Sequence, residues 1–191
     1  MSESGITGAL LARIAGLAVA LVFVQIGVIS EVPVLGVTVD VSPLLVAFVG
    51  LLCGSTLGAV TGFAVGLLVD LLLVQTLGVT SLLFTLIGFW AGRLRELRDP
   101  QAALTPLLVG AAAAATAMVG YSIIEFSLGV DAPVSFELLR QIVLGVVVDT
   151  LLALPLWLLV RRVLDPALPD DPRRRRRRAY TTGGLSPRSR A

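Results

Sequence analysis

The stretch that decides the fold runs from Val41 to Gly92 and reads VSPLLVAFVGLLCGSTLGAVTGFAVGLLVDLLLVQTLGVTSLLFTLIGFWAG. Its only acidic or basic side chain is that of Asp70. Because a transmembrane helix needs about 20 predominantly apolar residues, this stretch alone is long enough for two or three spans. The sequence therefore predicts an all-α integral membrane protein.

The composition of the whole chain agrees with this prediction. Of its 191 residues, 56% are hydrophobic and 15% are charged, and the mean hydropathy is +0.94. Soluble domains carry about 25% charged residues, so a water-soluble single domain is excluded. Cys53 is the only cysteine, which excludes a secreted scaffold held together by disulfides.

The chain lacks the residues that most catalytic and metal sites use. All 15 positive residues are Arg, and there is no His. Since His is the usual general base and the commonest metal ligand, a zinc site or a Ser/His or Cys/His catalytic arrangement cannot be built. No phosphate loop, nucleotide fingerprint or nucleophile elbow is present. We expect a protein that is not an enzyme and that uses no metal or other cofactor.

Six transmembrane helices are predicted from the apolar runs and the residues that interrupt them. Pro43 suits the first turn of the second helix, and Gly78 lies in the turn before the fourth. The expected bounds are Leu10 to Ile29, Pro43 to Cys53, Leu57 to Val74, Ser81 to Trp90, Leu104 to Leu128 and Leu138 to Val160. Residues 1–164 then form one transmembrane domain, with an interfacial or re-entrant loop from Val32 to Val39.

The distribution of Arg predicts the orientation of the bundle. With six spans and the N-terminus inside, every Arg except Arg140 falls on the head, the connector between the fourth and fifth helices, or the tail. Cytoplasmic loops carry the excess of positive charge in membrane proteins, so both termini are expected in the cytoplasm. Trp90 and Trp157 fall at helix ends, where we expect them to lie at the membrane interface.

Glycines recur at every fourth position from Gly50 to Gly66, and Asp70 follows in the same phase. Residues four apart share one face of a helix, and small residues let helices in a membrane approach closely. The predicted helix-packing or partner face consists of Gly58, Gly62, Gly66 and Asp70. This face either packs only within the chain or receives in part a partner helix or a ligand.

Three acidic residues fall within predicted spans: Asp70, Glu125 and Asp149. A carboxylate at membrane depth is costly, so each should face the bundle or a polar cavity. Glu125 and Asp149 are the buried polar candidates. A proton relay, a cation site and a carboxyl hydrogen-bonded between helices are the alternatives. Because Asp70 is expected near the outer side and Asp149 in mid-helix, an aspartyl catalytic pair is not expected.

The C-terminal segment, residues 165–191, differs in composition from the bundle. A Pro- and Asp-rich spacer leads into six consecutive arginines and a Gly/Ser/Thr/Pro end, which predicts a disordered cytoplasmic tail. The arginines are expected to contact anionic lipids. They are Arg173, Arg174, Arg175, Arg176, Arg177 and Arg178. No nucleic acid is expected as a partner, because stacking aromatic residues do not accompany the run.

Two short motifs carry a resemblance to a known family. The chain has Asp40-Val41-Ser42-Pro43 before its second helix, and Gly62-Phe63-x-x-Gly66-Leu67-x-x-Asp70 with a following Leu77-Gly78 turn. These features resemble the rod shape-determining protein MreD family, over roughly residues 10–162. The family usually has Pro directly before an Asp here, whereas this chain has Pro43 three residues after Asp40. The Arg-rich tail is not a family signature.

The resemblance implies a non-catalytic, multi-pass component of the bacterial cytoplasmic membrane. Such a protein belongs to the elongation (cell-shape) machinery and helps an MreC-like bitopic protein organise peptidoglycan synthesis. MreB and the RodA–transpeptidase synthase are the further partners that the resemblance implies. The family is also similar in fold to the substrate-binding subunits of energy-coupling-factor transporters. A small-molecule-binding subunit of such a transporter is therefore the alternative function.

Overall fold

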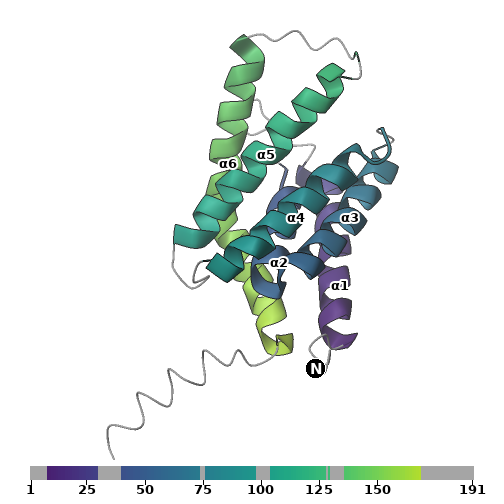
Figure 1. Cartoon of the computed structure of the whole chain (residues 1–191), viewed down its shortest axis with the longest axis vertical. Helices are drawn as coiled ribbons and strands as arrows, with labels where there is room; N and C mark the ends of the chain where they lie inside the picture. The colour runs from purple at the N-terminus through teal and green to yellow at the C-terminus, as the bar shows by residue number, and fades with distance from the viewer. Residues whose placement is uncertain are drawn as a thin grey trace, which may run out of the picture.

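The structure is a computed structural model that describes residues 8–29, 40–73, 76–97, 104–127, 129 and 136–168. Within these residues it contains six α-helices and no strand (Figure 1). The helices are α1 Gly8–Val24, α2 Ser42–Cys53, α3 Ser55–Leu72, α4 Val79–Leu97, α5 Leu104–Ser127 and α6 Phe136–Leu164. A π-helical turn, Gln25–Ile29, continues α1, and a 3-10 turn, Asp165–Ala167, continues α6.

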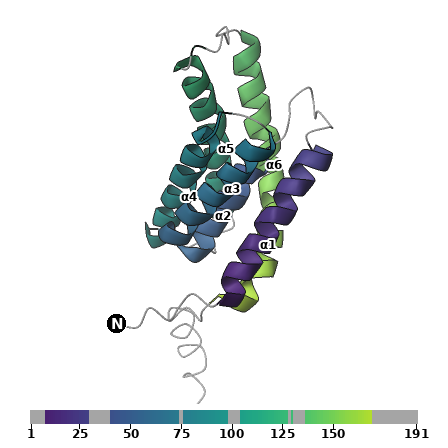
Figure 2. The same ribbon diagram turned by 90° about the vertical axis from the view of Figure 1, so that its right-hand side faces the viewer.

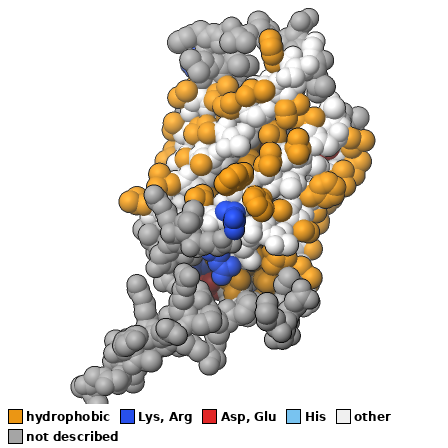
Figure 3. Space-filling model, viewed as in Figure 1, with side chains coloured by type: hydrophobic (Ala, Val, Ile, Leu, Met, Phe, Trp, Pro, Cys, Tyr) orange, Lys and Arg blue, Asp and Glu red, His pale blue; other side chains and the backbone are white. Residues whose placement is uncertain are grey.

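The predicted fold class, an all-α membrane protein, is confirmed. Four segments are long and apolar enough to cross a membrane, and α2 is a shorter apolar helix. The four are Gly8–Gly27, Ser55–Leu72, Leu104–Ile124 and Arg140–Ala167. Large apolar side chains also cover the outside of the bundle, as the face in Figure 3 shows. This is the surface expected of a protein whose surroundings are lipid rather than water.

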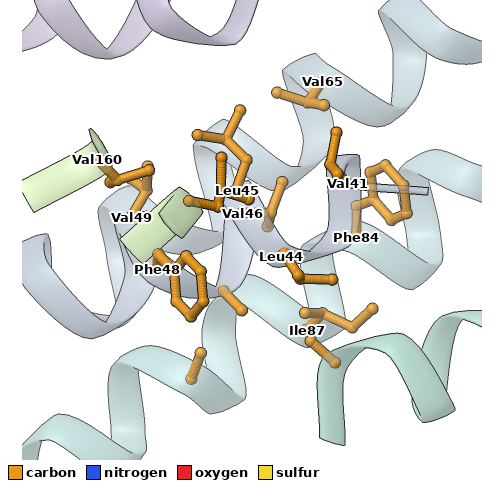
Figure 4. Packing of buried hydrophobic residues seen from close by; sticks show 14 of the residues in the cluster. Val41, Leu44, Leu45, Val46, Phe48, Val49, Val65, Phe84, Ile87 and Val160 are labelled. Carbon is orange, nitrogen blue, oxygen red and sulfur yellow. The ribbon is translucent and has the colours of Figure 1, made fainter. Parts of the chain in front are cut away.

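The short helix α2 is the centre of the bundle. Every residue from Val41 to Leu52 is buried, and α2 contacts each of the other five α-helices. Figure 4 shows α2 surrounded by side chains of α3, α4 and α6. A helix that is apolar all round suits either a protein core or a membrane, and α2 lies in the core of this bundle. Its 12 residues extend only about 18 Å, less than the hydrocarbon thickness of a membrane.

Helix α4 is longer than the sequence predicted. The expected end at Trp90 is wrong, because α4 continues to Leu97 and takes in Arg93 and Arg95. Arg, Leu and Glu are good helix formers, so charge alone does not end a helix. Positive side chains in the last turns also interact favourably with the negative end of the helix dipole.

Trp157 is not exposed at an interface. It is 6% exposed and packs edge-on against Phe48 of α2, with ring centroids 5.4 Å apart and an angle of 71° between the rings. The prediction for Trp157 was wrong because its position near a helix end gives no information about which face the bundle covers. Trp90 is 64% exposed, as a residue at the membrane interface would be.

The beginning of α1 and the end of α6 lie side by side at one end of the bundle (Figure 2). A guanidinium nitrogen of Arg13 donates a hydrogen bond to the carbonyl oxygen of Val163 at 3.0 Å. Arg161 forms an ion pair with Asp165 nearby, with 3.3 Å between Nε and Oδ2. We call this the Arg-rich end. Figure 3 shows an Arg patch toward the end of the bundle where the tail begins.

Some predictions fall outside the described residues. They include the loop from Val32 to Val39 and the tail from residue 169 onward, with all six arginines of the run. The domain boundary at residue 164 and the disorder of the tail therefore stay predictions.

Candidate functional site

The glycine face of α3 is covered by α4 of the same chain. A methyl group added at Gly58 would meet the backbone carbonyl of Gly88, and one added at Gly62 would meet that of Phe84. At Gly66 it would lie 2.6 Å from the backbone nitrogen of Ser81. Backbone atoms cannot move aside as a flexible side chain can, so glycine is required at all three positions. The close approach expected from the spacing is thus made within the chain.

Three helices meet where the glycines of α2 and α3 come together. A methyl group at Gly50 would collide with the carbonyl of Gly88, and one at Gly58 would lie 2.7 Å from the Cα of Gly50. Gly92 likewise faces the backbone of Ser55 at the start of α3. Gly88 and Gly92 are not part of the face predicted from the sequence. Their spacing of four within one helix was the signal that could have identified them.

Asp70 connects the end of α3 to the beginning of α4. Its side chain is fully buried, and its Oδ2 atom accepts a hydrogen bond from the backbone N–H of Gly78 at 2.8 Å. The hydroxyl of Ser81 donates to the same oxygen at 3.4 Å, and Oδ1 has no hydrogen-bond partner. A carboxylate before the first turn of a helix pairs with N–H groups that have no partner within the helix. Asp70 therefore caps α4.

A second buried carboxyl group, that of Asp149, lies in the middle of α6. Its side chain is fully buried, and neither carboxyl oxygen has a hydrogen-bond partner. It lies close to Asp40, the residue two positions before α2. Asp70 instead contacts the start of α4, so the structure does not join Asp70 and Asp149 in one site.

Ser42 and Gln25 contribute to the polar surroundings of Asp40. The backbone N–H of Ser42 donates to Oδ1 of Asp40 at 3.0 Å, while the hydroxyl of Ser42 is buried without a hydrogen-bond partner. The Oε1 atom of Gln25 accepts a hydrogen bond from the backbone N–H of Val41 at 3.2 Å. Asp40 is half-buried, and the protein atoms around it desolvate its carboxyl and raise its pKa, an effect that the backbone N–H of Ser42 opposes.

Only part of this polar cluster is predicted from the sequence. Asp149 is a predicted candidate, whereas Asp40 and Ser42 stand within a motif and Gln25 is not among the predicted residues. A lone glutamine in an apolar run was the available signal. Glu125 lies in α5, but its side chain is outside the described part of the structure. Within the described residues, no three His, Cys, Asp or Glu side chains form a metal site.

A groove of about 230 Å³ opens between α4 and α5. Trp90 and Leu94 lie on its α4 side, and Ala112, Ala113 and Thr116 lie on its α5 side. Ala47 of α2 also contributes to the lining. The groove is apolar, and small residues line its α5 side. It therefore has the chemistry of a helix-packing surface.

The comparison with protein families settles the family of this chain. Residues 7–163, which include all six α-helices except the last residue of α6, match the rod shape-determining protein MreD family. The chain belongs to the MreD family. The resemblance drawn from the glycine and aspartate motif is confirmed, and the chain is a rod shape-determining membrane protein.

The other two comparisons found no relative. No curated protein and no solved structure matches the chain. The expected similarity in fold to the substrate-binding subunits of energy-coupling-factor transporters therefore stays a prediction. Nothing in the comparisons supports the alternative function as a transporter subunit.

Proposed function

We propose that this MreD-family chain is a non-catalytic component of the elongation machinery, in which it helps an MreC-like bitopic protein organise peptidoglycan synthesis. The observation that carries this proposal is the family match, which extends over nearly the whole helical bundle. MreB and the RodA–transpeptidase synthase are further partners under the same proposal. The bacterial cytoplasmic membrane is its location.

The surface that we assign to the bitopic partner is the groove between α4 and α5. Association of helices in a membrane depends on close van der Waals packing, which small residues permit. Ala112 and Thr116 are one turn apart on α5 and exposed along the groove. A single transmembrane helix of the partner could therefore approach the backbone of α5. The corresponding glycines of α3 are already covered by α4.

Co-purification in mild detergent tests this assignment. The wild-type chain is expected to recover an MreC-like bitopic protein, and Ala112→Trp is expected to lower that recovery about tenfold by filling the groove. Val60→Trp is the matched control, because Val60 is 60% exposed on α3 and does not line the groove. Equal recovery with both variants would show that the partner binds elsewhere. Recovery of an ATPase pair with a coupling membrane subunit would instead identify a transporter component.

We further propose that both termini lie in the cytoplasm. The contact between Arg13 and Val163 supports this orientation, because it places the start of α1 and the end of α6 together among several arginines. Arg93 and Arg95 occupy the last turns of α4, and Arg95 lies 3.8 Å from the methyl position of Gly54 between α2 and α3. This end would then face anionic lipids, which the arginines of the tail also contact under our proposal.

A further inference from the structure

The polar cluster at the start of α2 has more oxygen acceptors than the described structure satisfies. Both carboxyl oxygens of Asp149 and the hydroxyl oxygen of Ser42 are buried without a hydrogen-bond partner. Asp149 is 0% exposed and Ser42 is 1% exposed, so bulk water does not replace those partners. Native structures leave few buried polar atoms unpaired, and an unpaired group indicates strain, a missing ligand or a functional role.

Three of the four unsatisfied atoms found in the described residues belong to one group, whereas the fourth, Oδ1 of Asp70, lies at the end of α3. Asp149 lies close to the backbone and the carboxyl group of Asp40. The backbone N–H of Ser42 donates to the carboxyl of Asp40. Asp40 therefore joins Asp149 of α6 to Ser42, the first residue of α2. Three oxygen-bearing side chains converge at one contact between two helices.

Two carboxylates in such a place need positive charge. Like charges that approach one another out of water repel strongly, so one must take up a proton or both must share a cation. Carboxylate and hydroxyl oxygens are hard ligands, which suit a small, hard cation. The three oxygen-bearing side chains supply donors of this kind and no nitrogen or sulfur ligand.

Most of the described arginines lie away from this cluster. The charged residues on the six helices are Arg13, Asp70, Arg93, Arg95, Glu96, Glu125, Glu137, Arg140, Asp149, Arg161 and Arg162. Apart from Arg140, the arginines among them lie toward the Arg-rich end. Arg140 lies nine residues before Asp149 on α6, about 14 Å along the helix axis. Asp70 is engaged by the start of α4.

We propose that Asp149, Asp40 and Ser42 form a binding site for one small monovalent cation, either a proton or Na⁺, between α2 and α6. The bound cation offsets the repulsion between the carboxylates and holds α6 against the central helix. Because Gln25 binds the backbone of Val41 beside the site, the end of α1 is connected to the same contact. The stability of the bundle thereby depends on the cation, independently of any partner protein.

Thermal unfolding of the full-length protein in mild detergent tests the proposal. The melting temperature is measured in NaCl and in choline chloride at equal ionic strength, and at several pH values between about 5 and 8. Asp149→Asn, Asp40→Asn and Ser42→Ala change the site. Asp70→Asn is the matched control, because it neutralises another fully buried carboxylate that already has hydrogen-bond donors.

If Na⁺ occupies the site, NaCl raises the melting temperature of the wild type by on the order of 5 °C over choline chloride. If a proton occupies it, lowering the pH raises the melting temperature with either salt. The sign follows from Asp40, since burial raises its pKa and the folded state therefore binds the proton more tightly than the unfolded chain. In both cases Asp149→Asn removes most of the response and Asp70→Asn retains it.

The proposal is overturned if the wild type and Asp149→Asn respond equally to both NaCl and pH. Asparagine has nearly the shape of aspartate and carries no charge, so Asp149→Asn is expected to fold without a bound cation. If Asp149→Asn fails to fold, the same comparison is made with two other variants. Asp40→Asn removes one charge, and Ser42→Ala removes one oxygen ligand. A full wild-type response in both of these variants would equally contradict the site.

Discussion

The Oδ2 atom of Asp70 accepts a hydrogen bond from the backbone N–H of Gly78 at 2.8 Å, which connects the last turn of α3 to the beginning of α4. This contact explains why an aspartate follows the glycines. Gly66, one turn before Asp70, packs against the backbone of Ser81, so the two helices are close enough for the carboxylate to reach the next helix. The glycines and the aspartate thus together hold α3 against α4.

Removal of the carboxylate of Asp70 is expected to destabilise the bundle. Asp70→Ala leaves the N–H of Gly78 without its acceptor, which corresponds to a loss of about 1–2 kcal/mol, the usual cost of removing a helix cap. Asp70→Asn keeps an oxygen that can accept this hydrogen bond and is expected to lose less. Thermal unfolding in detergent measures both.

The control is Asp165→Ala, which removes an exposed carboxylate near another helix end and should change stability by less than about 1 kcal/mol. Equal losses for Asp70→Ala and Asp70→Asn would show that charge, not hydrogen bonding, matters.

Enlarging Gly62 is expected to separate α3 from α4. In Gly62→Leu the new side chain meets the backbone of Phe84, so the helices must move apart and the fold or its complexes are lost. Gly62→Ala is milder, with an expected cost of about 3 kcal/mol from overpacking.

Gly16→Ala in α1 is the control, because a methyl group there meets nothing within 4 Å. It should gain up to about 1 kcal/mol from helix propensity. Size-exclusion profiles and melting temperatures distinguish the variants. A stable Gly62→Leu protein that supports normal rod shape would contradict this account.

Truncation of Phe48 tests whether α2 is the centre of the bundle. Phe48 is fully buried and packs against Trp157, so Phe48→Ala is expected to cost about 3–5 kcal/mol. Phe63→Ala removes the same atoms from a side chain that is 55% exposed on α3 and is expected to have little effect. The measurement is the melting temperature of each purified variant, together with Trp fluorescence. Similar losses in the two variants would mean that burial within α2 does not determine stability.

The orientation of the chain can be measured by cysteine labelling. In a Cys53→Ser background, Ala9→Cys and Pro166→Cys place thiols at the Arg-rich end, and Leu77→Cys places one in the turn between α3 and α4. A maleimide that cannot cross the cytoplasmic membrane should label Leu77→Cys in cells whose outer layers have been removed and whose cytoplasmic membrane is intact. It should label the other two only after lysis. The reverse pattern would place both termini outside, and a split between Ala9→Cys and Pro166→Cys would contradict their side-by-side placement.

Local patterns in the sequence were sufficient for much of the fold. Long uncharged runs identify spans because only helices satisfy backbone hydrogen bonds in lipid. The predicted helices overlap α1 to α6, and the second begins and ends within one residue of α2. The end of α4 was misjudged, because arginine marks the edge of the apolar region but does not end a helix.

The candidate site could be predicted only in part. The spacing from Gly58 to Gly66 identified a face for close packing, since helical periodicity fixes which residues share a face. Periodicity does not say what covers that face, and only the packing of α4 against it answers that question. Similarly, Trp157 and Phe48 are far apart in the sequence, so their contact left no local signal.

By itself, the sequence determined that this is a helical membrane protein of the MreD family, because hydrophobicity, helical periodicity and a short motif are all local properties. The tertiary structure decided that α2 is enclosed, that Asp70 caps α4, and that Asp40 meets Asp149. Each of these relationships joins side chains from segments that the chain brings together only on folding. Burial and charge proximity depend on three-dimensional packing, and for that reason the polar cluster between α2 and α6 emerged only from the structure.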